Sequence, residues 1–227
     1  MTLNKRIISE QKDDSKQQIA YNKIKASIIK NELLPDTLLV ERQLSNTLGI
    51  SRTPIREALR RLSSEGLVDF IPDKGMFVSK IRFEDMLEIF ELREALEGMA
   101  VRLFVLRKNS DIVRQMEECL ALQELAYKEG NYRLNVELDM EFHNFYLKGS
   151  KNLRLESFIN TVLDQNSRMA FYTVNDKERI QTSLVQHKQV LDAIRKGDSN
   201  EAEKLIKEHI INVKEYHIKN YYAININ

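Results

Sequence analysis

Cysteine, proline and glycine are all scarce in this chain. A single cysteine among 227 residues excludes an internal disulfide. Cys119 lies among Val113, Met116, Leu120 and Leu122, which indicates a packed thiol rather than a reactive one, so we assign it no function. Three prolines and seven glycines also leave few helix breakers, and long helices are therefore possible over most of the chain.

Long apolar runs are absent as well. The best candidate, residues 99–106, is interrupted by Arg102, and the polar N-terminus lacks the apolar core of a signal peptide. With 42% hydrophobic and 30% charged residues, the composition is that of an ordinary soluble globular protein. We therefore expect a cytoplasmic protein without a membrane partner, and a flexible N-terminal arm over residues 1–16, which are rich in Lys, Gln, Asp and Ser.

No strong excess of one charge is present, but the charges are unevenly distributed. The net charge is +1, yet residues 1–82 hold 15 Lys and Arg against 10 Asp and Glu, which leaves 20 against 24 for the remainder. A mildly basic front part joined to a mildly acidic one suits a DNA-binding switch, although so small an imbalance also arises by accident of local composition.

The most informative stretch is residues 49–61, GISRTPIREALRR. Gly49 relieves the backbone between two short helices, Ser51 or Thr53 can cap the second helix, and Pro54 fits its first turn. Ile55, Ala58, Leu59 and Leu62 recur at helical spacing and can pack inward, which leaves the arginines outside. The pattern predicts a helix-turn-helix; the alternative is a solvated, arginine-rich surface helix.

The flanking sequence favours the DNA-reading interpretation. An amphipathic helix is predicted over residues 21–31 and another begins at residues 40–48. Two short β-type runs, residues 67–71 and 76–79, enclose the turn sequence Pro72-Asp73-Lys74-Gly75. Three helices followed by a small β-hairpin make a winged helix-turn-helix, which we place at residues 17–82.

These phrases resemble the GntR family of bacterial transcription regulators. The matching words are LPD at 34–36, ERQL at 41–44, LGISRTPIREALRRL at 48–62, EGLV at 65–68 and GMFV at 75–78, with Asp36 where glycine is usual. The resemblance implies that Arg42, Arg52 and Arg56 contact bases and phosphates, that Ser51 and Thr53 support them, and that Lys74 and Gly75 place the wing tip in the minor groove. These roles agree with chemistry, since arginine donates two hydrogen bonds to guanine while hydroxyls and amides hold phosphates.

From Phe83 onward the pattern is helical throughout. Helices are predicted at 83–106, 111–129, 132–148, 152–174, 178–196 and 199–220, each with one apolar stripe. Short connections favour antiparallel neighbours, so residues 83–227 should form an all-α antiparallel helical bundle. The predicted fold is thus mainly α, with the winged domain in front of the bundle.

The placement of the four histidines is the second specific signal. Asp139 and His143 lie four residues apart, hence on one helical face, and His187 and His209 fall on two later helices whose inward faces they can share. Such a set suits a divalent ion, zinc, nickel or manganese, with open positions for a ligand. Taken without further context, the Asp139/His143 pair would more often be a surface pair. His217 lies roughly 80° around an ideal helix from His209, so it should point elsewhere and is left out.

The helical half resembles the FCD class, the effector domain of one large GntR subfamily. That class shows Asp, then His four residues later, then two His on the last two helices, and Asp139, His143, His187 and His209 match it position by position. The resemblance implies a bound metal ion and, near it, an arginine that lines the effector pocket, here Arg93. A surface salt bridge with Glu97 is the rival role for Arg93, and Asn166 and Arg168 are further polar candidates for effector binding.

The sequence therefore predicts a homodimeric transcription regulator, expected to be a repressor, that binds double-stranded DNA at an inverted-repeat operator. A small organic acid bound at the metal site would alter operator affinity. Two alternatives stay open: a metal sensor without an organic effector, and a metal-dependent hydrolase or isomerase. No nucleophile or acid/base motif accompanies the histidines, so we predict no enzymatic activity and no catalytic residues.

Overall fold

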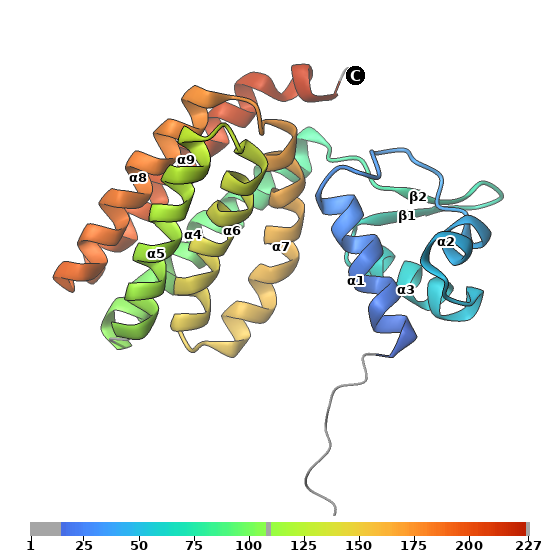
Figure 1. Cartoon of the computed structure of the whole chain (residues 1–227), viewed down its shortest axis with the longest axis horizontal. Coiled ribbons are helices and arrows are strands. Elements are labelled where there is room, and N and C mark those ends of the chain that lie inside the picture. Colours follow the sequence, from blue (N-terminus) through green and yellow to red (C-terminus); the bar gives the residue numbers. More distant parts are fainter. Residues whose placement is uncertain (1–14, 108–109, 226–227) are drawn as a thin grey trace, which may run out of the picture. The chain divides into compact units, whose positions relative to one another are not determined.

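The computed structural model describes residues 15–107 and 110–225, so nearly all of the predicted N-terminal arm lies outside the described residues. The chain divides into two compact units, one ending at Lys80 and one beginning at Ile81. Each unit has its own hydrophobic core. Figure 1 shows the elements of both units along the chain.

The first unit contains α1 (Lys16–Ile29), α2 (Glu41–Leu48) and α3 (Arg52–Ser64), followed by strands β1 (Val68–Ile71) and β2 (Gly75–Val78). Helix α1 begins where the Ser15 side chain accepts a hydrogen bond from the Gln18 amide. Helix α2 ends at Gly49, whose φ of 66° lies in the left-handed region that glycine adopts without strain. The predicted turn between α2 and α3 is therefore formed as expected.

The wing is a two-stranded antiparallel hairpin in which Val68 pairs with Val78 and Ile71 with Gly75. Its turn uses two residues of positive φ, Asp73 at 63° and Gly75 at 108°. Three helices and this hairpin confirm the predicted winged helix-turn-helix. Asp36 has a φ of 63°, which explains why glycine is usual at its position in the family that the sequence resembles.

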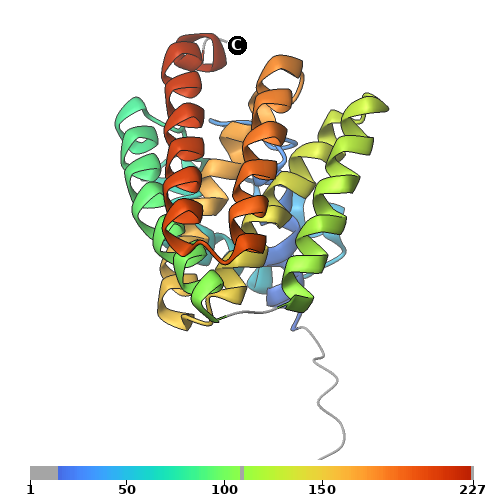
Figure 2. The same cartoon turned by 90° about the vertical axis from the view of Figure 1, so that its left-hand side faces the viewer.

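The second unit contains six helices among its described residues: α4 (Phe83–Arg107), α5 (Ser110–Lys128), α6 (Tyr132–Gly149), α7 (Leu153–Tyr172), α8 (Lys177–Lys196) and α9 (Ser199–Asn225). Side-chain oxygens of Asn131, Asn152 and Asp176 accept amide hydrogen bonds at the starts of α6, α7 and α8. In Figure 2, α9 lies between α4 and α8, against both of which it packs. The predicted helical bundle is confirmed.

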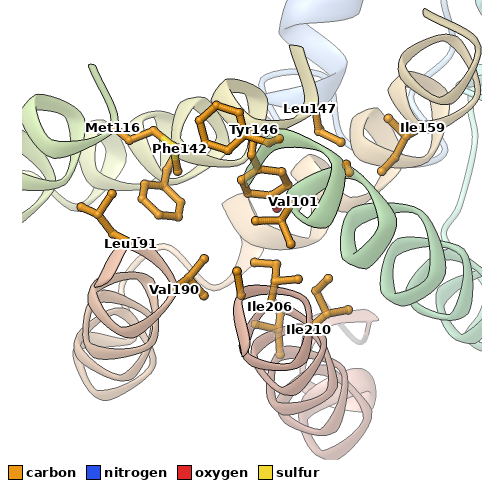
Figure 3. Close-up of a cluster of buried hydrophobic side chains, with 14 of the residues drawn as sticks. Val101, Met116, Phe142, Tyr146, Leu147, Ile159, Val190, Leu191, Ile206 and Ile210 are labelled. Carbon is orange, nitrogen blue, oxygen red and sulfur yellow. The ribbon is translucent and has the colours of Figure 1, made fainter. Parts of the chain in front are cut away.

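The core of the bundle draws side chains from all six helices. Figure 3 shows Phe142 and Tyr146 of α6 facing Val190 and Leu191 of α8 and Ile206 of α9. All five of these side chains are buried. Burying apolar side chains stabilises by roughly 1.5–3 kcal/mol each before the entropy cost, so this packing fixes the helices that carry the histidines.

Candidate functional site

Helix α3 presents a basic outer face and an apolar inner one. Its side chains Ile55, Ala58, Leu59 and Leu62 are fully buried, as the helical spacing predicts. The predicted DNA-contact residues of α2 and α3 are all exposed: Arg42, Ser51, Arg52, Thr53 and Arg56. Ser51 occupies the N-cap position of α3, but its side chain makes no capping hydrogen bond. Its hydroxyl therefore remains available to a phosphate.

One carboxylate on this face has no predicted role. Glu41 accepts two hydrogen bonds from Arg56, at 2.7 Å from Nε and 2.9 Å from Nη2, and lies 3.7 Å from Nη2 of Arg52. The Arg56 hydrogen bond lowers the pKa of Glu41. The contact with Glu41 thereby orients the Arg56 guanidinium before DNA binds. On binding a base, Arg56 would exchange its two hydrogen bonds to Glu41 for two to the base.

At the wing tip Lys74 is exposed and its amide donates to the Ile71 carbonyl, while Gly75 begins β2. The tip therefore carries a positive charge on a tight backbone turn, in agreement with the predicted minor-groove contact, which stays a prediction. Sequence reasoning placed these residues correctly on the surface but could not show the Glu41 contact.

In the bundle, three of the predicted metal ligands converge. His143 of α6, His187 of α8 and His209 of α9 each offer a ring nitrogen, and these nitrogens lie within 4.8 Å of one another. All three rings are buried, with centroids 5.1 Å apart for His143 and His187 and 4.7 Å apart for His187 and His209. Metal–nitrogen bonds of about 2.0–2.1 Å place the ligands of a tetrahedral ion about 3.3 Å apart, so the three rings lie near enough to close on one ion by small side-chain movements.

Each imidazole contacts, through its Nδ1 atom, a side chain that the sequence analysis did not assign to the histidines. The Nδ1 atom of His143 lies 2.5 Å from Oε2 of Glu97 and that of His209 lies 2.9 Å from Oε1 of Gln186. The corresponding atom of His187 lies 3.4 Å from Oε1 of Gln123. A proton on each Nδ1 leaves the Nε2 lone pair for a metal, and such outer partners are typical of histidine ligands.

The Nε2 atoms of His143 and His187 are buried and have no hydrogen-bond partner among the described residues. Burying an unpaired polar atom costs roughly 1–3 kcal/mol, so two such atoms on neighbouring rings fit a site for a metal ion. Asp139 lies beside the cluster, its Oδ1 atom 3.7 Å from Nε2 of His187, and its side chain is partly exposed. The four predicted ligands are therefore brought together, with Asp139 at the edge.

Burial keeps the imidazoles of His187 and His209 neutral. Burial lowers the pKa of His187 to about 4 and lowers that of His209 well below its usual range. Burial would raise the pKa of Glu97, but Arg93, His143 and Tyr146 outweigh it and hold the pKa well below its ordinary value. Neutral imidazoles beside an ionised carboxylate are the state in which histidine binds a metal.

Arg93 lies next to this cluster and is buried. Its Nε atom donates to Oε1 of Glu97 at 2.6 Å and its Nη1 atom to Oδ1 of Asn166 at 2.7 Å. The alternative interpretation was a surface salt bridge between Arg93 and Glu97. The salt bridge is formed, but it is not on the surface, because both side chains are buried. Arg168 is fully buried, and its Nη1 atom donates to Gln165. Arg93 and Arg168 are therefore buried in the bundle, whereas Asn166, which accepts from Arg93, is partly exposed.

A pocket of about 340 Å³ lies between α8 and α9. Its lining includes Arg179, Ser183, Val213 and Tyr216, together with Gln186, the residue that holds His209. The pocket therefore extends to within one side chain of the histidine cluster. Its size is that of a site for a small molecule.

His217 differs from the sequence-based expectation. It is not one of the three clustered histidines, as predicted, but it is 1% exposed and stacks on Phe90 of α4, with ring centroids 5.7 Å apart. The apolar arc of a core helix is at least 100° wide, so a position 80° from His209 still faces the interior. The helical spacing between His217 and His209 was the signal in the sequence that indicated burial of His217.

Together these features define a class: a regulator with a winged helix that reads DNA and a helical domain built around a candidate metal site. Comparison with known proteins agrees. Residues 16–78 match the gntR family of bacterial regulatory proteins and residues 88–212 match the FCD domain. The chain belongs to the GntR family and is a DNA-binding transcription regulator with an FCD domain.

Proteins similar to this chain are also named transcription regulators. The Nta operon transcriptional regulator of Aminobacter aminovorans is 30% identical over 177 residues, which cover 78% of this chain and 82% of that protein. The HTH-type transcriptional repressor RspR of Escherichia coli is 27% identical over 202 residues, covering 88% and 87%. The structure of E. coli McbR/YncC superposes with a TM-score of 0.82 at 22% identity over 91% of this chain and 99% of that one, which shows a shared fold.

Within the described residues, no helix is both long and apolar enough to span a bilayer.

Proposed function

We propose that this protein is a homodimeric repressor that binds an inverted-repeat operator and changes its operator affinity when a small carboxylic acid binds at a metal ion in the helical domain. The metal ligands are Asp139, His143, His187 and His209, and the ion is zinc, nickel or manganese. The observation that carries the proposal is the pair of buried, unpartnered Nε2 atoms of His143 and His187.

The ligand class follows from charge. A divalent ion with one carboxylate and three neutral imidazoles keeps a net positive charge, which attracts an anion to its open position. Arg93 pairs with Glu97, which in turn contacts His143, so its guanidinium is one side chain away from the proposed metal ligands. A carboxylate that binds the ion can therefore also accept a hydrogen bond from Arg93.

The DNA-binding part of the proposal uses the exposed basic face of α3 and the wing. Arg42, Arg52 and Arg56 read bases or hold phosphates, Ser51 and Thr53 hold phosphates, and Lys74 and Gly75 enter the minor groove. One recognition helix covers few base pairs, so a dimer on a palindrome supplies the specificity that a genome requires. Repression is proposed by analogy with RspR, which is named a repressor.

A surface for the homodimer is available on α4 and α7, which pack against each other. Leu92, Met99 and Leu106 are spaced by seven residues on α4 and are 45–59% exposed. On α7, Leu153 is 78% and Phe158 is 73% exposed. Exposed large apolar side chains on two helices that pack against each other suit a protein interface.

The proposal is tested by metal analysis of the purified protein, followed by operator binding with and without chelator and with and without candidate acids. An effect of an acid that requires the metal supports the proposed function. Chelator sensitivity without any effect of acids would favour a metal sensor. Turnover of an acid would favour the metalloenzyme alternative, and a failure to bind operator DNA would refute the regulator itself.

A further inference from the structure

Glu41 places a negative charge on the basic face that is proposed to contact DNA. Its carboxylate accepts hydrogen bonds from Nε and Nη2 of Arg56, at 2.7 and 2.9 Å, and lies 3.7 Å from Nη2 of Arg52. Glu41 belongs to the first turn of α2, whereas both arginines belong to the start of α3. The carboxylate therefore cancels part of the positive charge that the two arginines bring to DNA.

The position of Glu41 is also close to the path of any DNA that contacts both α3 and the wing. Glu41 and Arg56 line a hollow of about 560 Å³ between α3 and the hairpin, and Gly75 of the wing lines the same hollow. The side chain of Glu41 is 24% exposed, and those of Arg52 and Arg56 are 64% and 49% exposed. The three charged groups can therefore act on the same stretch of duplex.

DNA offers an arginine two kinds of acceptor. Phosphate oxygens are charged and are the same in every sequence, whereas N7 and O6 of guanine form a neutral edge that depends on sequence. A carboxylate beside the arginine repels a charged phosphate much more than it repels a neutral base edge. Glu41 should therefore weaken the attraction that all DNA shares more than the attraction that a guanine supplies.

The same contact fixes the orientation of Arg56. Its guanidinium is held in one plane by two hydrogen bonds before DNA binds. A group that is already oriented loses less side-chain freedom when it forms a second pair of hydrogen bonds with a planar partner. Loss of Glu41 should therefore reduce the advantage of guanine over phosphate in two ways, through charge and through orientation.

We propose that Glu41 is a specificity-determining residue, which holds Arg52 and Arg56 away from the phosphates of non-operator DNA and leaves them available to guanine at the operator. This inference rests on the proposed DNA contacts of the two arginines and extends them to the choice between operator and other DNA. A built-in repulsive group is a known way to obtain specificity. The alternative is that Glu41 only ties α2 to α3, in which case its loss weakens binding to every duplex alike.

The test uses full-length protein and two duplexes of equal length and base composition. The operator duplex is the one that the wild-type protein selects from a random-sequence library, and the second duplex is its scrambled version. Glu41→Gln removes the charge and keeps the size of the side chain. The matched control is Asp36→Asn, which removes one negative charge from the ion pair with Lys80 in the same unit without freeing an arginine of α3. Asparagine also tolerates the positive φ of residue 36.

We expect Glu41→Gln to bind the scrambled duplex at least about threefold more tightly than the wild type at low salt, because the freed arginines can then neutralise phosphates. The slope of log affinity against log salt concentration should steepen by about 0.9, the value for one further phosphate contact. The ratio of operator to scrambled affinity should fall. Asp36→Asn and the charge-conserving Glu41→Asp should keep the wild-type slope. Tighter binding to scrambled DNA would not result from damage to the fold, which weakens binding.

Three outcomes would count against these ideas, each in a different way. Equal or weaker binding of both duplexes by Glu41→Gln, with an unchanged ratio, would overturn the inference and make Glu41 a structural tie between α2 and α3. The same changes in Asp36→Asn would also overturn it, because the effect would then come from net charge alone. If the wild-type protein selects no duplex from the library, the proposed regulator itself fails, whatever Glu41 does.

Discussion

Replacing Glu97 by glutamine should destabilise the helical domain and weaken its metal site. The Glu97 carboxylate is fully buried and contacts Arg93, His143 and the hydroxyl of Tyr146. In Glu97→Gln the hydrogen-bonding shape remains, but the buried charge of Arg93 loses its partner. Removal of one member of a buried ion pair costs about 3–5 kcal/mol, which corresponds to a fall of about 6–20 °C in the melting temperature of a domain of this size.

The same substitution should lower metal affinity by about 10–100-fold, because an outer carboxylate raises the basicity of the imidazole that it holds. Calorimetric unfolding of the chelator-treated protein measures the first effect, and Ni²⁺ titration measures the second. A suitable control is Glu203→Gln. Glu203 also pairs with two cations, Arg102 and Lys207, but at 21% side-chain exposure, so its loss should cost under about 1 kcal/mol.

A second variant tests the cause. If the cost in Glu97→Gln comes from the unpaired charge of Arg93, adding Arg93→Met should recover at least about 1 kcal/mol of it, since the double variant buries no charge at this position. Equal melting temperatures for Glu97→Gln and Glu203→Gln would refute the reasoning. So would a double variant that loses more unfolding free energy than the two single variants lose together.

Three other predictions concern the surface, the DNA face and pH. Phe158→Glu places a charge on the exposed apolar surface of α7 and should yield monomers in light scattering; persistent dimers would exclude this surface. Arg56→Ala should weaken specific operator binding by about 1–3 kcal/mol and relax one base position, whereas Arg60→Ala should not, and equal weakening on random DNA would contradict the assignment. Because the pKa of His217 is lowered in the folded protein, its protonation does not oppose folding above the unfolded value of about 6.5. Below that value the unfolded chain takes up a proton that the folded protein does not, so stability falls. Between pH 6.5 and 5 the wild type should therefore lose up to about 1.4 kcal/mol per pH unit more than His217→Leu, as measured by urea unfolding, and parallel curves would show that His217 is not buried as a neutral ring.

Local rules were sufficient for most of the fold. The Gly49 turn, the Asp73–Gly75 hairpin turn and the Gly197 helix end all depend on backbone conformations that a few residue types adopt, so they can be read from short words. Helical spacing likewise identified Ile55 and Leu59 as inward-facing. These features depend on neighbours in sequence, which a single chain shows directly.

The candidate metal site was predictable only as far as its direct ligands. Asp139 and His143 share a helix, and the later histidines were matched through a family pattern. The groups that orient them were not found, because Glu97, Gln123 and Gln186 come from three further positions that only tertiary packing brings to the Nδ1 atoms. Glutamine and glutamate are common on exposed helix faces, so nothing in the sequence marks these three as buried.

His217 shows where helical phase alone fails. His217 lies roughly 80° around the helix from His209, so the two histidines do not bind the same metal ion. The angle does not prevent burial, because α9 packs against both α4 and α8 and its buried face is wide. The apolar neighbours of a core histidine argue for burial, whereas its two nitrogens argue for solvent or a partner. For a histidine on a core helix, the apolar residues at helical spacing around it therefore predict burial better than its angle from one metal ligand does.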